Sequence, residues 1–259
     1  AGCAAARPGD VAVVGFGSDD PDAVALLVLS PLPAGAEFFV TDHGWTGSGW
    51  RSTEGRLRYT APAAGVAAGT VLRWDARGGG DAAGGAWEAD ERFALATAGD
   101  QLIVYQQCGG AQEPSFLFAV TWQAGGAWSA PGSALSSRES VAPAALAQRG
   151  LALALPHRDN YAYAGPAAGL REDLLAALMD PSNWRGSNSA MQTVPAVAFD
   201  VLDAAAAGTT AEQGAETAAA GGAAPPPTTP APNASSTTPP STGSWATTTT
   251  RPAPAASAA

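Results

Sequence analysis

The chain has 259 residues, and its 23 acidic residues outnumber 13 basic ones, all arginine, to give a net charge of -10. An acidic protein repels phosphate groups, so the composition argues against a nucleic-acid partner. No apolar run reaches the roughly 18 residues that would predict a membrane span.

Short apolar segments separated by Gly, Pro and Asp residues predict strands along most of the chain. One helix is predicted over residues 170–179, because Leu170, Leu174, Leu175 and Leu178 share one helical face and Pro181 follows. The strands are predicted at residues 10–17, 23–29, 37–41, 56–60, 70–74, 101–107, 115–122, 151–155, 159–163 and 194–202.

The hairpin of residues 37–41 and 56–60 carries the clearest pattern. Leu57 and Tyr59 alternate with arginine and threonine, as expected of a strand with one buried face. A second hairpin is predicted from residues 101–107 and 115–122, whereas the glycine-rich residues 77–85 are expected to form a loop. Many short strands with turns between them predict an all-β fold, an antiparallel β-sandwich with one short α-helix.

The composition changes after residue 203. Residues 1–203 are expected to form the β-sandwich head, residues 204–224 an Ala/Gly-rich linker, and residues 225–259 an extended stalk of Pro, Thr, Ser and Ala. Such a stalk cannot bury a core, and its prolines favour polyproline II. Covalent glycans are expected on Asn233, the only N-glycosylation sequon, and at Pro225, Pro226, Pro227, Thr228, Thr229, Ser235, Thr237 and Thr238.

The chain contains only two cysteines, Cys3 and Cys108. The stalk predicts a secreted or cell-surface protein, and an oxidising compartment favours a disulfide between these two residues over two buried thiols. The start at Ala1, without Met, fits a mature product from which a signal peptide has been removed.

Several polar residues are candidates for a catalytic or a ligand-binding role. Asp42 and Glu54 suggest a carboxylate pair for glycoside hydrolysis, and Asp42 beside His43 suggests part of a triad, although turn chemistry explains these residues more simply. The sequence therefore predicts no enzyme. Clustered acids at residues 19–22 would suit Ca²⁺, although no EF-hand loop is present, and no other cofactor is expected. The segment GFGSDD lacks the third glycine of a dinucleotide-binding fingerprint.

Trp45 and Trp50 are the candidates for a sugar-stacking face, since aromatic rings bind the apolar face of a sugar. The competing interpretation is that these rings form part of the core.

A family resemblance rests on the segments GDVA (9–12), FVTDHGW (39–45), GDQL (99–102), DNYAY (159–163) and DPSNW (180–184). In combination they resemble a secreted β-sandwich module of bacterial and algal surface proteins, over about residues 9–187. The tail is similar to the hydroxyproline-rich glycoprotein stalks of algal extracellular matrices. The resemblance implies no catalytic residues.

Two functions follow as expectations. The first is a structural extracellular glycoprotein that self-assembles head to tail, with copies of itself as partners, into a glycan-coated fibre or cell-surface layer. The alternative is a carbohydrate-binding or adhesion module on a stalk.

Overall fold

A computed structural model describes residues 6–51, 54–80, 85–90, 92–107, 114–133, 135–192 and 198–202. All of them belong to one compact unit, Ala1–Ala215. The expected Cys3–Cys108 disulfide, the linker and the glycosylated stalk lie outside the described residues, so those expectations stay predictions.

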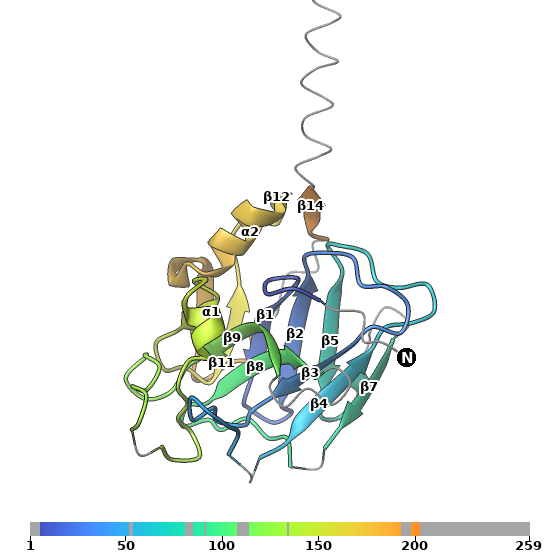
Figure 1. The fold of residues 1–259 in the computed structure, drawn as a ribbon. Coiled ribbons are helices and arrows are strands. Elements are labelled where there is room, and N and C mark those ends of the chain that lie inside the picture. Colours follow the sequence, from blue (N-terminus) through green and yellow to red (C-terminus); the bar gives the residue numbers. More distant parts are fainter. Residues whose placement is uncertain are drawn as a thin grey trace, which may run out of the picture. The chain divides into compact units, whose positions relative to one another are not determined.

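The fold is built mainly from β-strands, in two six-stranded sheets and one small sheet (Figure 1). The first sheet has the strand order β13-β11-β1-β2-β5-β6. Its strands are β1 (Val11–Gly17), β2 (Ala23–Val28), β5 (Val71–Asp75), β6 (Gly79–Gly80), β11 (Asn160–Tyr163) and β13 (Trp184–Ser187).

The second sheet has the order β10-β9-β8-β3-β4-β7. Its strands are β3 (Glu37–Thr41), β4 (Arg56–Thr60), β7 (Ala86–Ala89), β8 (Gln101–Gln106), β9 (Ser115–Thr121) and β10 (Ala152–Ala154). The small sheet pairs β12 (Ala168–Leu170) with β14 (Asp200–Leu202).

Both predicted hairpins are confirmed. Strands β3 and β4 pair antiparallel from Glu37↔Thr60 to Thr41↔Arg56, and Leu57 and Tyr59 are fully buried while their neighbours in β4 are not. Strands β8 and β9 pair antiparallel as well. The alternation predicted these elements because each strand has one face in the core.

Most strand pairs are antiparallel, as the expected antiparallel β-sandwich requires, but two are not. Strand β10 runs parallel to β9, and β14 runs parallel to β12. Parallel pairing requires a long crossover, and residues 122–151 supply one between β9 and β10. This crossover also contains a helix that the sequence did not predict, α1 (Ala144–Ala147), which is too short to show a helical period.

Other boundaries also differ from the expectation. The predicted glycine-rich loop contains β6, whose Gly79 and Gly80 pair with Asp75 and Trp74. The edge strands β7 and β13 were not predicted, because each has four residues and mostly exposed or half-buried positions. Of the predicted closing strand 194–202, the described part contains β14, and residues 193–197 are outside the description.

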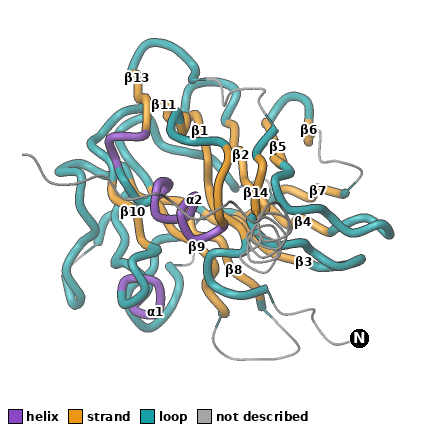
Figure 2. The backbone as a smooth tube through the Cα atoms, turned by 90° about the horizontal axis from the view of Figure 1, so that it is seen from above, coloured by secondary structure: helices purple, strands orange, loops and turns teal. Residues whose placement is uncertain are grey.

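Apolar residues of both six-stranded sheets contribute to one core. Phe16 of the first sheet stacks on Trp122, which follows β9 of the second sheet, with ring centroids 4.0 Å apart. The predicted helix is present as α2 (Arg171–Leu178), and Leu174 and Leu178 are its buried residues. In Figure 2, which is seen from above, α1 lies at the margin of the molecule, whereas α2 lies over the strands between β10 and β14.

Replacing Leu102 by Ala tests the assignment of the core. Leu102 is fully buried in β8, so Leu102→Ala should lower the free energy of unfolding by about 2–5 kcal/mol in denaturant titrations. Leu202→Ala is the matched control, because Leu202 is 44% exposed; its effect should stay within about 0.5 kcal/mol. Equal losses in the two variants would contradict the placement of the core.

Candidate functional site

Buried polar groups gather where β3 ends and β8 begins. Asp42 directly follows β3, and Asp100 directly precedes β8, its neighbour in the second sheet. Gln101 connects them through its side-chain amide. Its Nε2 contacts the backbone carbonyl oxygen of Asp42 and donates to Asp100 Oδ1 at 2.8 Å. Asp42 and Asp100 are only 1% and 3% exposed, so each would destabilise the fold if its oxygens lacked hydrogen-bond partners.

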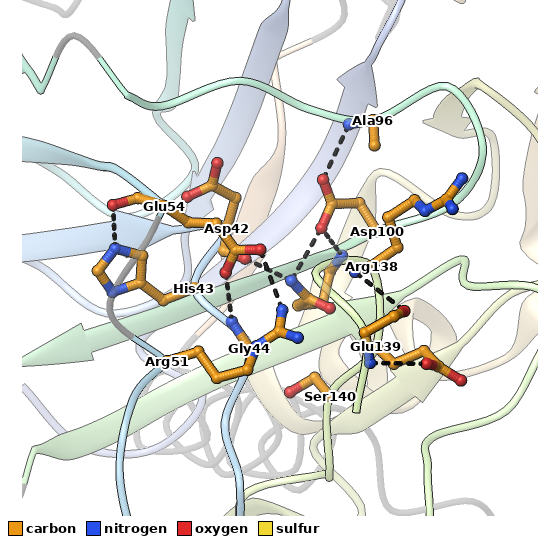
Figure 3. Close-up of polar contacts among 12 residues, drawn as sticks. Asp42, His43, Gly44, Arg51, Glu54, Ala96, Asp100, Arg138, Glu139 and Ser140 are labelled. Carbon is orange, nitrogen blue, oxygen red and sulfur yellow. Dashed lines mark hydrogen bonds and ion pairs between the residues drawn. The ribbon is translucent and has the colours of Figure 1, made fainter. Parts of the chain in front are cut away.

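Three carboxylates accept hydrogen bonds from three consecutive backbone amides. Ala94 N donates to Asp42 Oδ2 at 3.0 Å, and Leu95 N donates to Asp22 Oδ2 at 2.9 Å. Ala96 N donates to Asp100 Oδ2 at 2.8 Å, a bond drawn in Figure 3. We call this arrangement, Asp22, Asp42 and Asp100 with the amides of residues 94–96, the carboxylate clamp.

The carboxylate clamp connects the two large sheets. Asp22 precedes β2 of the first sheet, whereas the other two aspartates belong to the second sheet. The clamped segment also carries Phe93 and Leu95, both buried in the shared core, and the Phe93 ring packs edge-on against Trp74 at 5.3 Å. The clamp therefore fixes a segment that contacts both sheets.

Burial raises the pKa of all three clamp carboxyl groups. Desolvation is the largest cause in each case, and the backbone hydrogen bonds oppose it. The pKa of Asp42 is raised to about 7, with a further contribution from the negative charge of Glu54, and the pKa of Asp100 is raised well above its ordinary value.

Glu54 and His43 lie beside the clamp in a second set of contacts (Figure 3). Glu54 Oε2 accepts from Gly44 N at 3.0 Å, and Oε1 accepts from Arg51 Nη2 at 3.0 Å. The His43 ring contacts the backbone carbonyl of Glu54 through Nε2. Asp42 Oδ1 accepts from Gly55 N at 2.9 Å, so both of its oxygens have backbone donors.

The structure thus brings the sequence candidates Asp42, His43 and Glu54 together, but their polar atoms contact the protein's own loops. Both oxygens of Asp42 accept from a backbone amide, and the residue is only 1% exposed, so this carboxyl group is shielded from a molecule in solution. This arrangement stabilises the turn from β3 to β4. Sequence reasoning did not single out Asp100, although the GDQ turn before an apolar strand places an acid at a strand start.

The acidic residues 19–22, considered for calcium, have separate protein partners. Asp19 accepts from Asn160 Nδ2 at 2.6 Å, Asp20 pairs with Arg77 at 2.9 Å, and Asp22 belongs to the clamp. Within the described residues, no group of three or more His, Cys, Asp and Glu side chains is placed to hold a metal ion.

The candidate sugar-stacking residues Trp45 and Trp50 belong to a row of aromatic rings on the outer side of the second sheet. Trp45 and Trp50 lie with their ring centroids 5.0 Å apart, and Trp50 lies 5.0 Å from Tyr105, which stacks on Phe39. Trp45 is 8% exposed and packs with Ile103, whereas Trp50 is half-buried. Of the two, Trp50 retains ring surface for a ligand.

A pocket of about 370 Å³ adjoins this row at Phe39. Arg56 lies over the Phe39 ring at 4.9 Å, and Arg58 forms ion pairs with Glu37 and Glu88. In the sequence of β4, Arg56 and Arg58 alternate with buried residues. This alternation indicates the surface, because it places both arginines on the outer face of the sheet.

Comparisons with protein-family models, with curated proteins and with solved structures give no match for this chain. The resemblance to a secreted β-sandwich module therefore remains a prediction. Over the residues that the structure describes, no helix has the length and apolar character to cross a membrane.

The raised pKa values predict that the head is more stable at mildly acidic pH. Because the folded pKa of Asp42 is about 7, against 3.8 as the ordinary value, the folded protein binds more protons between these pH values. The contribution of Asp42 is fully present below about pH 4 and is lost as pH rises to about 7. The contribution of Asp42 to the free energy of unfolding should fall by about 4 kcal/mol across this range.

Denaturant titrations at pH 4, 5.5 and 7 would measure this slope. Asp42→Asn should flatten it, and should also cost about 1 kcal/mol or more at pH 4, because its NH2 group cannot accept from one of the two backbone amides, Gly55 N or Ala94 N. Stability that rises from pH 4 to pH 7 in the unmodified chain would contradict the assignment.

The close approach of Gly55 to the clamped segment gives an independent test. A Cβ added at Gly55 would lie 2.0 Å from the Phe93 backbone nitrogen, so Gly55→Ala should displace the segment and destabilise the head by about 2 kcal/mol or more. Gly49→Ala is the control, because a Cβ there meets open space. Thermal unfolding of both variants distinguishes them, and similar melting temperatures would argue against the clamped geometry.

Proposed function

We propose that this chain is a structural extracellular glycoprotein, in which a β-sandwich head and a glycosylated stalk build a fibre or cell-surface layer by head-to-tail association. The observation that carries the proposal is the composition of residues 225–259, which are almost entirely Pro, Thr, Ser and Ala. A segment of this composition lacks the apolar side chains for a core. It suits an extended chain whose side chains carry covalent modifications.

The stalk chemistry supports an extracellular role. Proline favours polyproline II, which extends by about 3.1 Å per residue. Glycans on Thr228, Thr229, Ser235, Thr237 and Thr238, and on hydroxylated prolines, would stiffen the chain and cover it with water-binding groups. Asn233 lies in the same stretch.

The arrangement of the head supports a role without catalysis. The carboxylates that first suggested an enzyme, Asp42 and Glu54, have backbone and arginine partners for their oxygens. Two six-stranded sheets with a common core suit a sandwich head, and the clamp fixes the segment between them. A rigid head of this kind serves as a building block.

The sheet edges offer a route to association. Among the described strands, β6 and β13 end the first sheet, and β7 and β10 end the second. Edge strands pair with a further strand when nothing covers them. Contacts between different surfaces of successive copies generate a filament when the rotation from one copy to the next does not close into a ring.

Glycopeptide mass spectrometry of native material over residues 225–259, combined with negative-stain imaging, tests the proposal. We expect dense hexose or pentose on Pro, Thr and Ser residues, together with filaments or sheets of regular spacing. An unmodified tail on a monomeric protein at physiological concentration would overturn the proposal.

A carbohydrate-binding or adhesion head is the second candidate, favoured by the pocket at Phe39 and Arg56, which Tyr105 connects to the half-buried Trp50 in the same row of rings. Trp50→Ala and Arg56→Ala should each weaken retention on immobilised polysaccharide by about tenfold, whereas Arg138→Ala, an exposed arginine elsewhere, should not. Equal retention of the three variants would exclude this surface as the binding site.

A further inference from the structure

The outer face of the first sheet contains two rows of very small residues. In the strand register, Gly15 lies opposite Ala25, and Gly17 lies opposite Ala23. On the same face, Ala25 and Ala23 pair with Arg73 and Asp75 of β5. The intervening row points the other way, since Phe16 stacks on Trp122 in the core.

These rows form the floor of a trough of about 440 Å³, lined mostly by apolar surface. Arg73, Asp75 and the glycines of β6 line one side, and Met191 and Gln192 line the other. The floor offers no backbone hydrogen bonds, because the amides and carbonyls of β1, β2 and β5 are directed to neighbouring strands. An occupant of the trough must therefore bring few polar backbone groups of its own.

Met191 shows that an apolar side chain suits this floor. A Cβ at Gly17 would lie 2.7 Å from Met191 Sδ, so glycine is needed for the thioether to lie against the strand. Met191 is nevertheless 41% exposed, one of two large apolar side chains with this exposure among the described residues. Its outer side is available to a second molecule.

We propose that this trough binds the proline-rich segment 224–230 from the tail of a second copy of the chain. The proposal rests on the proposed function, because it names the contact through which heads and tails associate. The tail supplies 57 residues beyond Leu202, the last described residue, which is length enough to reach a neighbouring head.

The sequence of this segment fits the trough chemically. Polyproline II has three residues per turn, so in that conformation Ala224, Pro227 and Pro230 would share one edge, and all three residues are apolar. Proline has no N–H, so its burial on a floor without acceptors leaves no donor unpaired. Small and ring-shaped side chains match a floor of glycine and alanine.

The same geometry assigns docking and glycosylation to different edges of the segment. In a bound polyproline II helix, Thr228 and Thr229 would lie on the other two edges, away from the trough. They remain free to carry glycans in the bound state. Pro227, expected from the sequence to be modified, is instead buried in this arrangement and should carry less glycan than Pro225 and Pro226 in assembled material.

A binding experiment with the full chain tests the proposal. A fluorescent peptide of residues 223–232, AAPPPTTPAP, is added in excess to full-length protein held below its assembly concentration. Ala23→Phe should weaken peptide binding by about tenfold or more, because the new ring fills the trough. Ala89→Phe makes the same change on the exposed edge strand β7 of the other sheet and should leave binding unchanged.

Paired peptide variants test the predicted edge. Peptides carrying Pro227→Glu and Pro230→Glu should lose binding, and peptides carrying Thr228→Glu and Thr229→Glu should retain it. A photoreactive group in place of Gln192 should crosslink to the peptide, and in mixtures of isotopically light and heavy chains it should crosslink to the tail of the other copy. Crosslinks to a second head, or to the tail of the same chain, would overturn the proposal.

The outcomes for assembly and for docking are separable. If native chains assemble while Ala23→Phe and the edge variants have no effect, the docking proposal fails and the structural function stands. If the peptide binds with the expected edge preference but native chains form no polymer, docking is supported and the fibre function fails. A cooperative thermal unfolding transition of Ala23→Phe is the control that shows whether the variant is folded.

Discussion

The carboxylate clamp is the interaction on which the arrangement of the head depends. Three aspartates from separate parts of the chain, Asp22, Asp42 and Asp100, hold three consecutive amides, and no strand pairing does this for residues 94–96. All three bonds are partly buried, and two of the acceptors, Asp42 and Asp100, are almost fully buried, so loss of a donor there leaves a desolvated carboxyl oxygen without this partner. The clamp positions Phe93 and Leu95 in the core between the sheets.

The hydrogen bonds of these carboxylates hold loops of the protein itself. Buried acids with raised pKa values are often catalytic, but structural networks perturb pKa values as well. Here the oxygens of Asp42 are directed to backbone donors, and Glu54 is held by Gly44 and Arg51. Our two proposals for recognition therefore rest on other parts of the described residues, the small-residue trough on the first sheet and the aromatic row on the second.

The sequence predicted the elements whose pattern is local. The alternation at Leu57 and Tyr59, the apolar runs of β1 and β8, and the leucine spacing of α2 each follow from one buried face, which a single segment encodes. Strand β10 was predicted at residues 151–155, but its parallel pairing with β9 was not, because that pairing depends on a long crossover. The edge strand β7 was missed, because its placement depends on the neighbouring strand. The clamp was also missed: its three aspartates look like ordinary turn residues, and only the fold brings them to one segment.

Amide hydrogen exchange of the full chain, followed residue by residue with NMR, tests the clamp most directly. If the clamp holds the head together, the amides of Ala94, Leu95 and Ala96 exchange as slowly as the buried strand residue Val104, through unfolding of the whole head. Exchange of these three amides at the rate of an exposed loop, with Val104 still protected, would contradict the account.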